Sequence, residues 1–157
     1  MTKYTNLQIT LHWVIFVLIA FQYIFHEPIA QAFDLRVEGK EFNRSILIPM
    51  HLVFGGLVFL LLWPRLWARI KYGSPEFPDE NSRVLRYISK FVHWSFYLVL
   101  FLLPITGAAA WFNLSIGAGK AHEALRGILI ILVQLHIGGA LFHYFMQKKD
   151  IFKRMRW

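Results

Sequence analysis

The sequence of 157 residues contains no cysteine. Disulfide bonds, thiolate-ligated zinc, iron–sulfur clusters and covalently attached c-type haem are therefore excluded. Any metal centre must be held by other side chains, and any haem must be held without a covalent bond to the chain.

Charged side chains are also scarce. They make up 17% of the chain, whereas 57% of the residues are hydrophobic and 17% are aromatic. A soluble domain of this length carries more charge and shorter apolar runs. The net charge of +8 comes from basic residues that cluster just outside the apolar runs, as orientation signals of membrane proteins do. We expect one membrane domain over residues 1–157, surrounded by lipid, with no nucleic-acid partner.

Four apolar segments are long enough to cross a bilayer, which takes about 20 helical residues. The predicted spans cover residues 7–25, 46–67, 88–111 and 123–146. The first is long enough to stay as a helix instead of being removed as a signal peptide. Pro104 lies inside the third span and predicts a kink, not a break. The prolines at residues 74–78 predict a loop. We predict an all-α, integral membrane four-helix bundle whose spans are joined by loops.

Basic residues are distributed unevenly between the loops. Residues 69–90 contain five basic and three acidic side chains, the tail after residue 146 contains five basic side chains and one acidic one, and residues 112–122 contain only Lys120. Lys and Arg are enriched on the cytoplasmic side of membrane proteins. We therefore expect both termini in the cytoplasm and a multi-pass protein in the bacterial inner membrane.

Histidines are concentrated in the apolar segments. An ionisable side chain in hydrocarbon is costly and usually faces the bundle interior with a partner, and a neutral imidazole binds metals well. The seventh histidine, His26, is expected to be only an interfacial residue. The other six lie inside or at the ends of the predicted spans: His12, His51, His93, His122, His136 and His143.

His122, at the start of the fourth span, and His136 are 14 residues apart. Fourteen residues rise about 21 Å and return nearly to the same face of a helix. The predicted topology puts His51 at the depth of His122 and His12 at the depth of His136. Two histidines that face each other across a bundle can bind one haem iron, and filling both axial positions favours electron transfer over oxygen binding. Zinc and copper usually need three or four close ligands, and only pairs are found here.

Small residues follow the paired histidines. Gly55 and Gly56 follow His51, Gly127 follows His122, and Gly138 and Gly139 follow His136. Such residues would let a porphyrin approach the backbone. They are equally typical of helix-packing seams, and the pattern leaves both interpretations open.

Five ordered motifs carry a resemblance to a known family. They are Leu7-Gln8-Ile9-Thr10-Leu11-His12-Trp13; Met50-His51 with Gly55; His93 with Leu103-Pro104-Ile105-Thr106-Gly107; His122-Glu123; and Leu135-His136-Ile137-Gly138-Gly139-Ala140-Leu141-Phe142-His143-Tyr144. In this order, over nearly the whole chain, the sequence resembles the bacterial branch of the cytochrome b561 family of di-haem membrane cytochromes.

The resemblance implies two haems b. His12 and His136 would ligate the iron on the cytoplasmic side, and His51 and His122 the iron on the periplasmic side, which is the pairing that depth alone gives. Arg65 and Arg126 are candidates to pair with haem propionates, and Gly55 is a candidate cofactor contact.

The resemblance also implies a ubiquinone site beside the inner haem, formed by His93 and His143. An imidazole there would donate a hydrogen bond and a proton to the quinone. Some family members resemble superoxide oxidase, in which superoxide gives its electron to the outer haem and ubiquinone is reduced. The basic residues Lys120 and Arg126 bracket His122 and are candidates to attract the anion, although the predicted outer loops are close to neutral overall.

Three functions remain open at this point. The first is an oxidoreductase that oxidises superoxide and reduces ubiquinone. The second is an electron-transfer subunit that relays electrons between quinol and a periplasmic redox protein, with the first loop as its docking surface. The third is a non-redox packing or transport module whose histidines relay protons.

Overall fold

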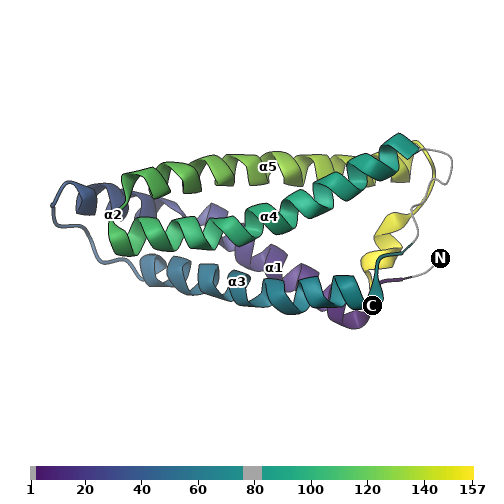
Figure 1. Cartoon of the computed structure of the whole chain (residues 1–157), viewed down its shortest axis with the longest axis horizontal. Helices are drawn as coiled ribbons and strands as arrows, with labels where there is room; N and C mark the ends of the chain where they lie inside the picture. Colours follow the sequence, from purple (N-terminus) through teal and green to yellow (C-terminus); the bar gives the residue numbers. More distant parts are fainter. Residues whose placement is uncertain (1–2, 76–82) are drawn as a thin grey trace.

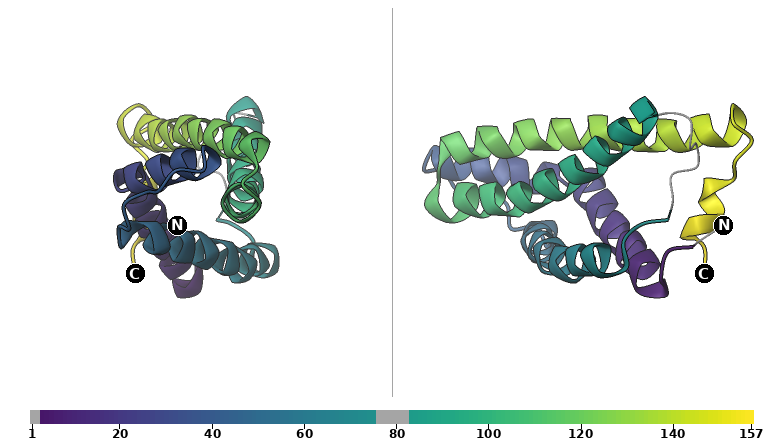
Figure 2. Two further views of the ribbon diagram at one scale, coloured as in Figure 1. Left: turned by 90° about the vertical axis from the view of Figure 1, so that its left-hand side faces the viewer. Right: turned by 45° about the vertical axis from the view of Figure 1, so that its right-hand side comes forward.

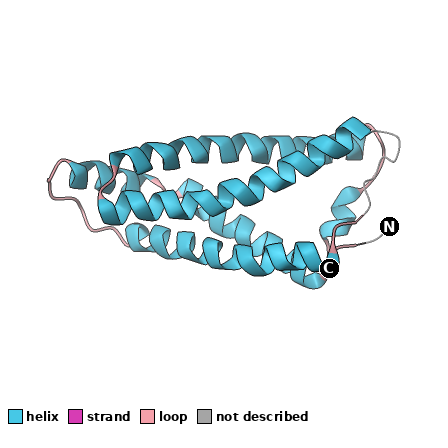
Figure 3. Cartoon of the chain, viewed as in Figure 1, coloured by secondary structure: helices cyan, strands magenta, loops and turns pink. Residues whose placement is uncertain are grey.

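The computed structural model describes residues 3–75 and 83–157, and in these ranges all regular structure is helical (Figure 3). The helices are α1 (Asn6–Ile24), α2 (Glu27–Val37), α3 (Leu47–Tyr72), α4 (Arg83–Asn113), α5 (Ile116–Phe145) and a short 3-10 helix, η1 (Ile151–Met155). Four of them, α1, α3, α4 and α5, are long and apolar enough to cross a membrane. The predicted all-α bundle of four spans is confirmed.

The long helices form two pairs, with α1 packed along α3 and α4 packed along α5, and the pairs meet mainly where α3 contacts α4. Both chain termini lie at one end of the bundle and α2 lies at the other (Figure 1). We call these the terminal end and the α2 end. Viewed along the bundle, α1 and α3 lie below α5 (Figure 2). The shared position of the termini agrees with an even number of spans, and the membrane face at which they lie stays a prediction.

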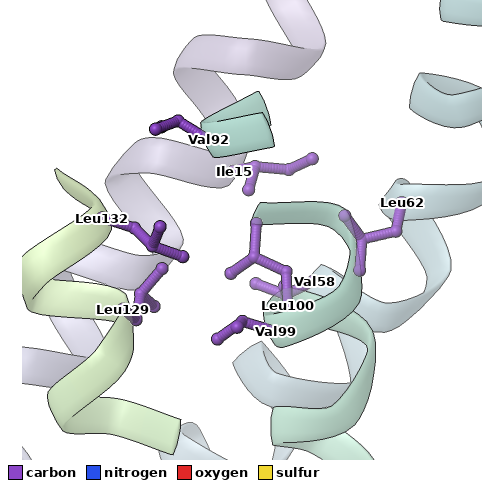
Figure 4. Close-up of a cluster of buried hydrophobic side chains, with 8 residues drawn as sticks. All are labelled: Ile15, Val58, Leu62, Val92, Val99, Leu100, Leu129 and Leu132. Atoms are coloured by element: carbon purple, nitrogen blue, oxygen red, sulfur yellow. The ribbon is translucent and has the colours of Figure 1, made fainter. Parts of the chain in front are cut away.

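A small aliphatic core joins the four spans near their middle (Figure 4). It consists of Ile15, Val58, Leu62, Val92, Val99, Leu100, Leu129 and Leu132. Many other large apolar side chains point outward: Val17, for example, is 61% exposed and Leu60 is 63% exposed. In a bilayer such side chains face lipid, and close packing of the inner side chains holds the helices together.

A buried glutamine ties α1 to α3 at the terminal end. Thr5 and Gln8 cap the start of α1 reciprocally, since the side-chain oxygen of each accepts a hydrogen bond from the backbone N–H of the other. The Gln8 Nε2 also donates to the carbonyls of Ala68 at 3.3 Å and Gly73 at 3.0 Å. Gly73 has φ +70°, a conformation that favours glycine and ends α3. These bonds therefore hold the start of α1 against the end of α3.

The predicted first loop is partly wrong, because it contains the 11-residue helix α2. Its signals are local: Pro28 lies in the first turn, Glu27 favours the start and Arg36 favours the end. Arg36 also anchors the helix, because its Nη1 donates to the Trp111 carbonyl at 2.9 Å and its Cζ lies 4.2 Å from the centre of the indole. The helix α2 is thereby fixed to the end of α4.

The predicted loop over residues 112–122 is also wrong. The helix α4 runs to Asn113 and α5 starts at Ile116, so only Leu114 and Ser115 connect them. Leu114 adopts φ +51°, and the Ser115 hydroxyl accepts from the Ala118 N–H at 3.3 Å. His122 therefore lies in the second turn of α5, not at its start.

Other boundaries differ by several residues. The helix α3 continues to Tyr72 and α4 begins at Arg83, so both extend beyond the predicted spans. The helix α4 is continuous through Pro104, as predicted. In the predicted proline-rich loop, Ser74 and Pro75 are not helical, and residues 76–78 lie outside the described residues.

Candidate functional site

Two pairs of histidines face each other across the bundle, and α5 supplies one member of each. The ring centres of His51 on α3 and His122 on α5 are 6.4 Å apart, and we call these residues the α2-end pair. The ring centres of His12 on α1 and His136 on α5 are 6.2 Å apart, and they form the terminal-end pair. A metal about 2 Å from one nitrogen of each ring separates the ring centres by about 6 Å. Both separations fit one iron held between two imidazoles.

His122 is oriented by the backbone of α4. Its Nδ1 donates to the Leu103 carbonyl at 2.9 Å and lies 3.3 Å from Thr106 Oγ1. Its ring packs on Gly107 so closely that a Cβ there would lie 3.0 Å from the ring. With Nδ1 occupied as a donor, Nε2 keeps its lone pair for a metal, which is the usual arrangement of histidine ligands.

His51 lacks the corresponding support. Its Nδ1 is buried and has no hydrogen-bond partner within the part of the chain that the structure describes. Buried polar atoms are nearly always satisfied, so an unsatisfied one needs an explanation. An imidazole that is to bind iron through Nε2 must keep a proton on Nδ1, and the burial of this nitrogen is compatible with that role.

In the terminal-end pair, His12 contacts an arginine from α3. Arg65 Nη2 lies 3.1 Å from His12 Nδ1, and Arg65 Nη1 donates to the Gln8 carbonyl at 3.5 Å. A guanidinium only donates, so His12 Nδ1 accepts this bond and the neutral ring carries its proton on Nε2. To bind iron through Nε2, His12 would have to move this proton to Nδ1 and give up the bond from Arg65. The positive charge of Arg65 is thus in direct contact with a predicted ligand, which the sequence did not indicate.

The two predicted quinone-site histidines have different surroundings. The His93 ring centre lies 5.3 Å from that of His136, and its Nδ1 donates to the Ser89 carbonyl at 2.6 Å. His143 is only 8% exposed, and its Nδ1 lies 2.7 Å from Gln147 Oε1. His93 therefore belongs to the immediate surroundings of the terminal-end pair, and His143 lies two turns nearer to the end of α5.

The predicted basic residues at the α2 end also differ. Lys120 is exposed, whereas Arg126 is partly buried. Arg126 lines a cavity of about 380 Å³, and the Tyr23 hydroxyl donates to its carbonyl at 2.6 Å. The other residues that line this cavity are Tyr23, His26, Glu123, Gly127 and Ile130. His26, expected to be only interfacial, lies at a cavity that contains a candidate site residue.

The glycines near the histidines divide into two groups. A Cβ at Gly55 would lie 3.4 Å from Gln22 Nε2, in van der Waals contact with a side chain of α1. At Gly56, Gly127, Gly138 and Gly139, no atom of the described residues lies within 4 Å of the Cβ position. All four glycines are exposed in the described part of the chain, and their contact with a porphyrin stays a prediction.

The alternative of a zinc-like site gains no support. Among residues 3–75 and 83–157, no three histidine or acidic side chains are arranged to hold a metal ion. The sequence does not reveal hydrogen-bond partners such as the Leu103 carbonyl and the Tyr23 hydroxyl, because they meet the site only when helices far apart in the sequence are packed together.

The chain is similar to known proteins over nearly its whole length. The profile of the prokaryotic cytochrome b561 family matches residues 3–157. The chain is 32% identical to cytochrome b562 of Cereibacter sphaeroides over 97% of this chain and 94% of that protein. It is 22% identical to the probable superoxide oxidase CybB of Yersinia pestis, over 98% of this chain and 95% of that protein. It is 24% identical to cytochrome b561 homolog 1 of Escherichia coli, over 99% of this chain and 97% of that protein.

Proposed function

The chain belongs to the prokaryotic cytochrome b561 family of haem b membrane electron-transfer proteins, and from this membership we propose that it moves electrons across the bacterial inner membrane to ubiquinone. In this proposal, residues 1–157 form a single domain that binds two haems b. The observation that carries it is the spacing of the two histidine pairs, 6.4 Å and 6.2 Å between ring centres.

Four histidines hold the cofactors in this proposal. His51 and His122 bind one iron at the α2 end, and His12 and His136 bind the other at the terminal end. When bound, haem b supplies a reversible one-electron centre. Because His122 and His136 are about 21 Å apart along α5, the two sites together cover most of a hydrocarbon core about 30 Å thick.

The distribution of basic residues sets the orientation of the protein in the membrane in this proposal. The terminal end carries the basic tail and the basic connection between α3 and α4, so we assign it to the cytoplasm. The α2 end is then periplasmic. Arg65 and Arg126, one at each end and both partly buried, are the side chains suited to bind propionates.

Superoxide is the donor that we propose first, supported by the likeness to a probable superoxide oxidase. Two superoxide ions each give up one electron and leave as O2. Ubiquinone takes up the two electrons and two protons. Lys120 and Arg126 supply positive charge near His122, and the cavity lined by Arg126 gives a small anion a place to approach.

Ubiquinone is proposed to bind at the terminal end, near His93 and His143. The contact between His93 and His136 puts an imidazole beside the terminal-end iron ligands. Because Nδ1 of each ring contacts an oxygen of the protein, either histidine donates a hydrogen bond and a proton to a quinone carbonyl through Nε2 when the ring is protonated at both nitrogens. The burial of His143 suits a group that exchanges protons with bound quinone and not with bulk water.

The first experiment is a reduced-minus-oxidised spectrum of the purified protein with pyridine haemochrome quantitation. Two haems b per chain with a low-spin α-band are expected. A colourless protein would contradict the proposal and favour a proton relay. Rapid mixing with superoxide then tests the donor, with superoxide dismutase and boiled protein as controls. Haem reduction no faster than in the controls would exclude superoxide.

A second candidate donor has specific support from α2. Its exposed Glu27 and Asp34, together with Glu38 at its end, recur at helical spacing and form an acidic stripe, in which Glu38 pairs with Lys40 at 2.6 Å. Negative charge repels superoxide but attracts a basic redox protein. The chain is then an electron-transfer subunit between quinol and a periplasmic partner, and a stoichiometric partner that co-purifies from native membranes is the expected result.

A further inference from the structure

Two unsatisfied buried atoms lie at the α2 end. One is Oε1 of Gln22 on α1, and the other is Nδ1 of His51 on α3. Neither atom has a hydrogen-bond partner among the residues that the structure describes. One is an obligatory acceptor and the other becomes a donor when the opposite ring nitrogen binds a metal, so their needs are complementary.

The contacts between α1 and α3 bring these side chains to the same place. Gln22 Nε2 lies 3.4 Å from the Cβ position of Gly55, and the neighbouring rings of Phe21 and Phe54 are 4.9 Å apart. His51 precedes Gly55 by four residues, so both lie on the same face of α3, one turn apart. The carboxamide of Gln22 therefore lies within one helical turn of the His51 position.

We propose that Gln22 is the positioning residue for His51 and accepts a hydrogen bond from its Nδ1–H through Oε1. This inference rests on the proposed haem-binding role of His51. The carboxamide turns about its last bond to bring Oε1 rather than Nε2 toward the ring. Nε2 lies at the far end of an imidazole, so a bond at Nδ1 directs Nε2 into the space between α3 and α5.

The neighbouring glycine lies close to the carboxamide in this arrangement. A Cβ at Gly55 would lie 3.4 Å from Nε2 as the side chain now stands, so an alanine there would contact the carboxamide directly. Gly55 thus lies beside Gln22, and its predicted contact with a porphyrin stays a prediction.

With this proposed bond, both histidines of the α2-end pair have an acceptor for their Nδ1–H. His122 already donates its Nδ1–H to the Leu103 carbonyl at 2.9 Å. With Gln22, each ligand of this pair has one neutral oxygen acceptor. Such acceptors increase the basicity of a histidine ligand and stabilise the oxidised metal. Gln22 therefore lowers the midpoint potential of the α2-end haem.

The test compares Gln22→Leu, which removes the acceptor, with Gln22→Glu, which retains one. The full-length haem-loaded protein is titrated potentiometrically, and the ferric low-spin EPR signals are recorded. The α2-end haem is identified as the one lost in His51→Ala. Gln134→Leu serves as the control, because Gln134 is an exposed glutamine on α5.

The expected result is opposite shifts of one midpoint potential. Gln22→Leu raises the midpoint of the α2-end haem and shifts its EPR g values, and Gln22→Glu lowers the midpoint. The terminal-end haem and both haems of Gln134→Leu keep their wild-type midpoints. A purely structural role would move Gln22→Leu and Gln22→Glu in the same direction, and that outcome overturns the inference.

Other outcomes are equally decisive. Unchanged midpoints in both Gln22 variants overturn the inference while leaving the di-haem proposal intact. A wild-type protein without haem contradicts the proposed function itself, so the two failures are distinguishable. If Gln22→Leu does not fold, Gln22→Glu alone still has to lower the α2-end midpoint.

Discussion

The two histidine pairs have nearly equal ring separations but different neighbours. The direct neighbours of the α2-end pair are neutral, namely the Leu103 carbonyl and Gly107, with Gln22 as a proposed third, and the positive charge of Arg126 lies close to the pair. The terminal-end pair contacts the guanidinium of Arg65 and a third imidazole, His93. Ring separation decides whether one iron fits, whereas the neighbours decide how strongly a bound iron holds an electron.

This difference favours one direction of electron flow. Neutral acceptors on ligand N–H groups stabilise the oxidised state, and a nearby positive charge stabilises the reduced state. In the proposed function, the direct contact of Arg65 with His12 outweighs the charge of Arg126 near the other pair, so the α2 end is the better donor and the terminal end the better acceptor. Electrons from a periplasmic donor would move toward the quinone with the local electrostatics, and not against them.

The strongest way to break the comparison is to remove one pair. We expect His136→Ala to lose the terminal-end haem and to retain the α2-end haem, halving the pyridine haemochrome yield. Unchanged Soret intensity and unchanged midpoints would contradict the assignment. His26→Ala is the control, because His26 belongs to neither pair and is expected to leave the haem content at the wild-type value.

Next in size is a change that displaces His122 without altering it. Gly107→Val puts side-chain atoms where even a Cβ lies 3.0 Å from the imidazole, so the ring must move away from the Leu103 carbonyl. We expect loss of most of the α2-end haem, measured by the same quantitation. Gly117→Ala is the matched control, since the described residues leave its Cβ position open. Full haem occupancy in Gly107→Val would show that His122 does not depend on this contact.

A smaller effect tests the charge at the terminal end. Arg65→Gln removes the cation beside His12 and is expected to lower the terminal-end midpoint by roughly 60 mV, which corresponds to a tenfold change for a one-electron couple. Arg65→Lys keeps the charge and is expected to stay closer to the wild type. A redox titration in which both variants match the wild type would remove Arg65 from the explanation of direction.

The smallest structural change is expected from His143→Ala. Both haems are retained with unchanged spectra, and the rate of quinone reduction falls roughly tenfold to a hundredfold because a proton donor is lost. Stopped-flow mixing of the reduced protein with a short-chain ubiquinone measures this rate. An unchanged rate would remove His143 from the quinone site and leave His93 as the remaining candidate.

Sequence reasoning predicted the spans and the pairing because both depend on local periodicity. Apolar length fixes a membrane helix, and a 14-residue interval fixes two side chains on one face. The helix α2 was missed because a short polar helix has no strong periodic signal and is stabilised here by contacts of Arg36 with Trp111. The short connection at Leu114 and Ser115 was missed because weakly apolar residues such as Gly117 and Ala118 continue the helix.

The immediate neighbours of the histidines were less predictable than the histidines. Arg65 was interpreted as a propionate partner or an orientation signal, and its contact with His12 depends on how α1 and α3 are aligned. Gln22 was not predicted as a site residue, because a single polar residue in an apolar segment has no spacing pattern. Both become interpretable only when the packed helices define which atoms lack a partner.

The helix α5 carries one histidine of each pair, so the rise of its backbone sets the distance between the two pairs. Bilayers differ in thickness, and helices respond by tilting or sliding against one another. Such adjustments change how α1 and α3 meet α5, but they leave the rise from His122 to His136 untouched. If these histidines hold two haems as proposed, the distance between the haems is therefore independent of lipid composition. A single residue inserted between these histidines would turn one of them by about 100° away from its partner and interrupt electron transfer between the two ends.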